Sequence, residues 1–235
     1  MRFNPEIFGS VIVAVGSFNP AIFSPDWLLS RKLIGSGDCD AAQQAGSLIV
    51  TSQVSAFETD WFHLQVVDNQ FSLTSKGALT PAIRDLAQGI FETVPHTPVT
   101  AVGLNFLGHF KMATEEDYHL VGDTLAPKAV WREIYDQNTF DVGLADMQVF
   151  VYRAKRGQSP DSPDRVTIQL QPSSKIKVGI YLSSNDHRAK FASEPANANA
   201  ASAALIVQNY WEASLSEAER VFDGLLSNAT AKGPM

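Results

Sequence analysis

The chain has 235 residues, of which 45% are hydrophobic and 18% charged, a composition typical of a globular protein and not of a disordered one. Its formal net charge of −7 disfavours non-specific binding to nucleic acid or to an anionic membrane, because that binding depends on neutralising phosphates. The single cysteine, Cys39, excludes an intramolecular disulfide. The apolar run Val11–Val15 is too short to span a membrane, and Asn4, Pro5 and Glu6 precede it where a signal peptide carries positive charge. We therefore expect a cytoplasmic protein with no membrane span.

The first part of the chain predicts a strand, a short helix, three more strands and a second helix. Ser24 before Pro25 is typical of an N-cap followed by proline at the first helical position. The polar, glycine-containing stretch Gly35–Gly46 predicts a loop, and Asp68-Asn69 predicts a tight turn. The predicted ranges are the strand Val11–Phe18, the helix from Ser24 to about Lys32, the strands Ser47–Phe57, Trp61–Val67 and Gln70–Thr74, and the helix Thr80–Val94.

The second part repeats this order of elements. Its first strand shares the sequence Ala-Val-Gly with the strand at Val11–Phe18. The predicted ranges are the strand Val99–Phe106, a helical region from Glu115 to about Tyr135 interrupted at Pro127, the strands Val142–Arg153, Val166–Gln171 and Ile176–Ser183, and the helix Ala200–Asn228. We interpret residues 1–98 and 99–235 as two similar halves of one compact unit.

The C-terminal helix carries the clearest periodicity. Its apolar residues alternate spacings of three and four and form one seam, which indicates packing against a sheet. The seam consists of Ala204, Val207, Trp211, Leu215, Ala218, Phe222 and Leu225. A capping-box pattern begins at Ser216, but the seam passes through it without a change of phase, which favours one continuous helix.

Several strands alternate strictly between apolar and polar residues. Val166, Ile168 and Leu170 are separated by polar residues, and the same pattern holds around Phe62 and Leu64. Such alternation indicates a sheet with one buried and one wetter face, whereas a parallel sheet covered on both sides gives continuous apolar runs. The predicted fold is α+β, with a mainly antiparallel twisted sheet of about eight strands in two similar strand–helix halves and helices on one face.

The wetter face is the candidate partner-binding surface. Aromatic and amide side chains on an open sheet suit protein binding or self-association. The six candidates are Trp61, His63, Gln65, Gln169, Gln171 and Tyr181. The alternative is an ordinary solvated face on which a few aromatic residues are covered.

No motif predicts catalysis, a metal or a cofactor. The chain has no phosphate-binding glycine loop, no nucleophile elbow and no metal-ligand spacing among its five histidines. His109 and His119 lie close in sequence to Glu115, Glu116 and Asp117, which we interpret as an acidic helix start.

Two further polar clusters predict solvated turns. The cluster of Arg153, Lys155 and Arg156 is interpreted as a turn between strands, and Ser184-Asn185-Asp186-His187 as a turn after a strand. Adjacent residues on an extended chain point apart, which disfavours an Asp186–His187 catalytic pair.

Three segments carry a resemblance to a known group. The run Phe57–Asn69 (FETDWFHLQVVDN), the helix Pro81–Val94 and the run Val99–Asn105 (VTAVGLN), with Gln171-Pro172-Ser173 in support, resemble a sporadically distributed family of uncharacterised bacterial α+β proteins of similar length. The resemblance implies two related strand–helix units and, as background, a role in antiviral defence. It implies no functional residue.

The leading hypothesis is therefore a non-catalytic binding or sensing module that engages a protein partner or its own copy. Two alternatives stay open. One is a hydrolase or transferase with a dispersed active site that uses His63, His109 or the Asp186–His187 pair. The other is a protein with a small-ligand pocket between sheet and helices.

Overall fold

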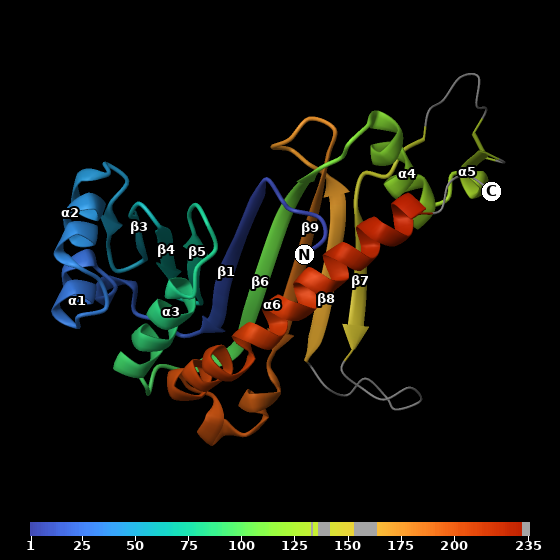
Figure 1. Ribbon diagram of the computed structural model, residues 1–235. Helices are drawn as coiled ribbons and strands as arrows, with labels where there is room; N and C mark the ends of the chain where they lie inside the picture. The colour runs from blue at the N-terminus through green and yellow to red at the C-terminus, as the bar shows by residue number, and fades with distance from the viewer. Residues whose placement is uncertain (133, 136–141, 153–163, 232–235) are drawn as a thin grey trace.

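The computed structural model describes residues 1–132, 134–135, 142–152 and 164–231. They form an α+β fold around one nine-stranded antiparallel sheet with the order β2-β3-β4-β5-β1-β6-β9-β8-β7 (Figure 1). The strands are β1 (Ile7–Gly16), β2 (Ile49–Val50), β3 (Val54–Glu58), β4 (Phe62–Val67), β5 (Gln70–Ser75), β6 (Val99–Lys111), β7 (Met147–Tyr152), β8 (Arg165–Pro172) and β9 (Gly179–Arg188). The helices are α1 (Pro25–Ser30), α2 (Ser36–Gln44), α3 (Ala82–Thr93), α4 (Glu115–Leu125), α5 (Ala129–Arg132) and α6 (Ala200–Ala231), with short 3-10 turns at Pro20–Ile22, Lys190–Ser193 and Pro195–Asn197.

The central strands β1 and β6 pair with each other along the whole of β1. On one side of this pair follow β5, β4 and β3, and on the other side follow β9, β8 and β7. With the short β2 beyond β3, one flank has four strands and the other has three, and the strands of each flank run consecutively along the chain.

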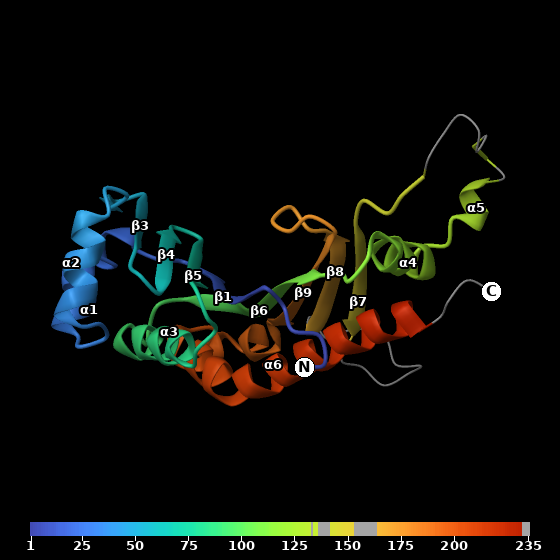
Figure 2. The same ribbon diagram turned by 45° about the horizontal axis from the view of Figure 1, so that its top comes forward.

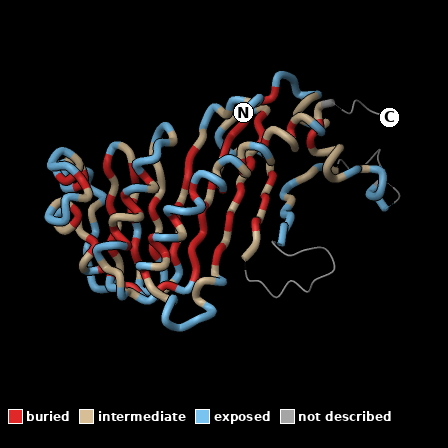
Figure 3. The backbone as a smooth tube through the Cα atoms, turned by 60° about the horizontal axis from the view of Figure 1, so that its bottom comes forward, coloured by how far each residue is buried: buried red, intermediate tan, exposed pale blue. Residues whose placement is uncertain are grey.

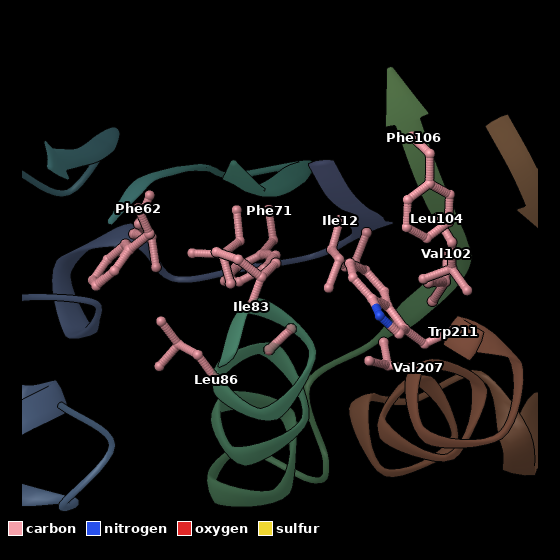
Figure 4. Packing of buried hydrophobic residues seen from close by; sticks show 14 of the residues in the cluster. Ile12, Phe62, Phe71, Ile83, Leu86, Val102, Leu104, Phe106, Val207 and Trp211 are labelled. Carbon is pink, nitrogen blue, oxygen red and sulfur yellow. The ribbon is translucent and has the colours of Figure 1, made fainter. Parts of the chain in front are cut away.

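Helices α3 and α6 lie side by side against the same face of the sheet (Figure 2). Along β3, β4, β8 and β9, buried residues of this core face alternate with half-buried or exposed residues that point outward (Figure 3). Ile12 and Leu104 of the central strands, Phe71 of β5 and Trp211 of α6 meet in one apolar cluster (Figure 4). Burial of its apolar seam supplies most of the stability of a helix such as α6.

Local capping fixes the start of α1 as the sequence predicts. The Ser24 hydroxyl accepts a hydrogen bond from the Trp27 N–H at 3.1 Å, and Pro25 occupies the first helical turn. The C-terminal helix is likewise continuous from Ala200 to Ala231, through the capping-box pattern at Ser216.

Three predicted segments are corrected by the structure. The stretch Gly35–Gly46 is not a loop, because α2 occupies most of it and the Asp38 carboxylate accepts the Gly35 N–H at 3.1 Å. The predicted strand Ser47–Phe57 is divided into β2 and β3, since the Thr51 hydroxyl accepts the backbone N–H groups of Gln53 and Val54 in a turn. The segment 173–178 is a loop, so β9 begins at Gly179 instead of Ile176.

Candidate functional site

The face of the sheet opposite α3 and α6, here called the open face, carries five of the six predicted side chains. Strand registers define it, because directly paired residues point to the same side of a sheet. His63 of β4 is opposite Thr74, which is opposite Val11, Asn105, Asn185 and Thr167 in turn across the sheet. Every second residue along a strand points to the same face, which adds Gln65, Gln169, Gln171 and Tyr181 to the open face.

The open face has an unusual charge distribution for an acidic chain. At its described positions on the six strands from β4 to β8 there is no Asp or Glu, although the net charge is −7. Two cations, Lys111 and Arg165, lie on this face. Acidic residues collect elsewhere, as at the start of α4. The open face of these six strands thus combines amides and hydroxyls with the Tyr181 ring and with aliphatic residues such as Val11, Val13 and Leu107.

Three of the predicted residues form one cluster with a histidine. Gln171 pairs with Tyr181 across β8 and β9, and Tyr181 pairs with His109 of β6. The Tyr181 and His109 rings are 4.9 Å apart between centroids, and Gln169 donates to the Gln171 side chain at 3.4 Å. We call Gln169, Gln171, Tyr181 and His109 the Tyr181 cluster.

His109 anchors the loop that follows β8. Its Nδ1 lies 2.8 Å from the Ser173 hydroxyl oxygen, which also accepts the N–H groups of Lys175 and Ile176 at 3.1 and 2.9 Å. Because that oxygen already accepts two hydrogen bonds, we infer that its own hydrogen donates to Nδ1, which requires a neutral ring protonated at Nε2. The loop also contains Val178 at φ 55°, a strained conformation for a β-branched residue.

The environment of His109 favours the same neutral form. Burial lowers its pKa below the ordinary value of 6.5, and the nearby positive charge of Lys175 lowers it further. The folded state therefore binds a proton less readily than the unfolded state. The stability contribution of neutral His109 is complete above about pH 6.5 and is lost as the pH falls toward the folded pKa.

We expect the His109→Gln variant to lose less stability on acidification than the parent protein, since glutamine also offers an acceptor but does not titrate. The measurement is the free energy of unfolding in urea at pH values of about 7.5 and 5.5. Equal losses for the two proteins would show that His109 does not titrate as described. His187, whose pKa burial also lowers, contributes equally to both proteins.

The other predicted residues lie apart from the Tyr181 cluster. His63 and Gln65 are on β4, separated from β8 by four strands, which corresponds to about 24 Å at the usual strand spacing. Trp61 precedes β4 and packs against the edge of the core, and its indole N–H donates to the Asp38 carboxylate of α2 at 2.9 Å. The expectation that Trp61 stands free on the open face is therefore corrected.

The Asp186–His187 pair is divided between the two faces. His187 points to the open face, whereas the buried Asp186 carboxylate accepts two hydrogen bonds from Arg188, at 2.8 and 3.1 Å, and one from the Ser214 hydroxyl of α6. The Arg188 guanidinium lies 3.5 Å above the Tyr210 ring. The predicted turn at Ser184–His187 is in fact part of β9, and Asp186 connects the sheet to α6.

Within the described part of the chain, no three His, Cys, Asp or Glu side chains gather in a way that fits a metal ion. A cavity of about 120 Å³ lies between α4 and the ends of β8 and β9, lined by His119, Asp123, Lys128, Leu170 and Ile180 among others. It is smaller than typical ligand pockets of roughly 300–1,000 Å³, whereas a second cavity of about 320 Å³, lined by Trp131 and Tyr135 among others, is at the lower end of that range. The cluster of Arg153, Lys155 and Arg156 lies outside the described residues.

The comparisons with known proteins identified no relative of this chain. No family model matches the chain, and the search of curated proteins found no similar sequence. None of the described helices has the length and apolar character needed to cross a membrane.

Sequence reasoning did not include His109 among the binding candidates. The strand prediction ended at Phe106, and β6 continues to Lys111. The period of two along β6 could have revealed it, because Asn105, Leu107 and His109 are every second residue and therefore point to the open face.

Proposed function

We propose that the protein is a non-catalytic binding module that engages a protein partner through its open face, with the Tyr181 cluster at the centre of contact. The observation that carries this proposal is a wide sheet surface whose described strand positions, from β4 to β8, include amide and aromatic groups and no carboxylate in an acidic chain. The carboxylates beside this surface are Glu58, opposite His63 on β3, and Asp146, which accepts a hydrogen bond from Gln169 at 3.1 Å. Interfaces are enriched in aromatic residues and depleted in charged ones at their centres. The resemblance to bacterial proteins suggests antiviral defence as the biological process in which this binding takes place, and it identifies no partner.

The open face also has the dimensions of an interface. Six strands at a spacing of about 4.8 Å, each contributing about 20 Å of length, cover several hundred Å². A standard interface buries about 800 Å² on each partner. The order β5-β1-β6-β9, with α3 and α6 side by side, supports two related halves, a relation that we propose with the function.

The test places a photo-crosslinking amino acid at Gln171 on the open face or at Gln208, an exposed glutamine of α6. We expect a discrete adduct in the native host from position 171 and none from position 208. Adding Tyr181→Ala is expected to weaken partner binding about 30-fold, the equivalent of roughly 2 kcal/mol. Adducts from position 208 alone would place the contact on the helix layer and contradict the proposal.

One contact favours a second candidate function, a hydrolase that uses Ser173 as nucleophile and His109 as base. The 2.8 Å contact has the reach that general-base catalysis needs. Two backbone N–H groups already bind the same hydroxyl oxygen, however, and His109 is only 7% exposed. This arrangement serves a loop anchor better than an attacking group. A Ser173→Ala variant that keeps its partner adduct would separate the two functions.

A further inference from the structure

The end of the sheet at β7 concentrates exposed apolar side chains. Val149, Phe150, Val151 and Tyr152 are 44%, 51%, 46% and 49% exposed. Phe150 is opposite Thr167 and points to the open face, whereas Val149 is opposite Ile168 and points to the core face. Both faces of this strand are therefore exposed and apolar.

The two edges of the sheet differ. At the far edge, β2 has only two residues, Ile49 and Val50, and short edge strands limit pairing with other chains. The edge strand β7 has six residues, MQVFVY, with no charge and no proline. Among the described residues, β8 is its sole pairing partner. Within the part of the chain that the structure describes, β7 therefore has none of the features that usually protect an edge.

We propose that the outer edge of β7 pairs antiparallel with β7 of a second copy, so that two chains form one continuous sheet. A two-fold axis perpendicular to the sheet produces this contact and keeps both open faces on the same side. It also restricts the register, because opposite residues must point to the same face. Either Val149 or Phe150, the two middle residues of the strand, then lies opposite its own copy.

Charge permits a second copy as the occupant, because the edge strand itself is uncharged. Two chains that each carry −7 repel one another, and the repulsion is smallest where the surface is uncharged. The six residues of β7 contain no charged side chain, and the Arg165 guanidinium of β8 lies 5.7 Å from the centroid of the Phe150 ring. Pairing of identical strands places valines against valines or phenylalanine against phenylalanine, and such pairs stabilise sheets.

The β7 end of the molecule carries further exposed apolar area. Four aromatic rings are about half exposed: Phe150 and Tyr152 on β7, and Trp131 and Tyr135 in and just after α5, which lies beyond the same end of the sheet (Figure 1). At roughly 150–250 Å² per ring, their exposed parts provide about 300–500 Å². Val130 and Ile134 are each 67% exposed and add to this area. The total approaches the roughly 800 Å² per partner of a standard interface.

Sedimentation velocity of the full chain at ~100 µM tests the proposal, because interfaces of standard size have Kd values from micromolar to picomolar. We expect a dimer, and we expect Phe150→Glu to weaken it at least about 30-fold while circular dichroism stays unchanged. Leu205→Glu, at a residue of α6 that is 56% exposed, is the matched control and should leave the dimer intact. Tyr152→Lys is the second variant if Phe150→Glu does not fold.

Disulfide capture tests the register. Phe150→Cys or Val149→Cys is expected to yield a covalent dimer on non-reducing gels, and Leu205→Cys is not, since native Cys39 is buried. A monomeric parent protein, a dimer that Phe150→Glu does not affect, or the failure of both cysteine variants to link would each overturn the proposal. The dimer is measured without the crosslinker at Gln171, so failure of the dimer proposal is distinguishable from failure of the proposed open-face function.

Discussion

Trp211→Ala is expected to destabilise the protein by about 3–5 kcal/mol, the cost of removing a large aromatic side chain from a close-packed core. Trp211 is 1% exposed and packs edge-to-face on Phe106 of β6, with ring centroids 4.9 Å apart. It is thus a main contact between α6 and the central strands. The measurement is the free energy of unfolding from urea titration.

Leu205→Ala is the matched control for Trp211, since Leu205 lies on the same helix but is 56% exposed. We expect it to change stability by less than about 0.5 kcal/mol. If Trp211→Ala also costs less than about 1 kcal/mol, α6 does not cover the sheet in solution, and its apolar seam is available to another molecule.

Asp186→Ala is expected to cost about 3–5 kcal/mol, because it leaves the charge of Arg188 buried without its carboxylate. Both side chains are nearly inaccessible, at 2% and 8% exposure. The Ser214 hydroxyl would also lose its acceptor, which weakens the connection between α6 and β9. Unfolding in urea at low and high salt measures the effect, and burial should make it insensitive to salt.

The double variant Asp186→Leu/Arg188→Met separates the cost of an unpaired charge from the value of the ion pair. Apolar replacement of a buried pair is often neutral, so we expect the double variant to be more stable than either single variant. If the two single effects simply add, Asp186 and Arg188 do not act as a pair.

The spacing of apolar residues predicted those helices and strands in which these residues form one buried face. The seam of α6 places Val207, Trp211 and Phe222 in the core as expected, because seven spaced apolar positions define one face of a long helix. In contrast, α2 buries only Cys39 and Ala42, which is too weak a pattern for recognition. Its polar residues and glycines are equally typical of a loop.

The end of β9 was missed for a different reason. The sequence Ser-Ser-Asn-Asp-His-Arg has the composition of a turn, and isolated charges are costly inside a core. The strand continues because Asp186 and Arg188 neutralise each other beneath α6. Mutual compensation of this kind depends on tertiary contacts that a local pattern does not contain.

The sequence predicted which face of the sheet most candidate residues share, but not how far apart they lie on that face. Alternation placed Gln169, Gln171 and Tyr181 on one face, as the registers show. It gave no information on strand order, so the distance between β4 and β8 could not be predicted. Trp61 precedes its strand, and its contact with Asp38 comes from a helix that the sequence pattern did not reveal.

The position of α6 in the chain has a consequence for biosynthesis. The core face of β6 is complete at Lys111, yet the helix that covers it begins only at Ala200. At synthesis rates of about 5–20 residues per second, Phe106 and its neighbours stay uncovered on the ribosome for roughly 5–20 s. Chaperones that shield nascent apolar surface therefore matter most in this interval, and a premature stop codon before residue 200 should yield fragments that aggregate or are degraded.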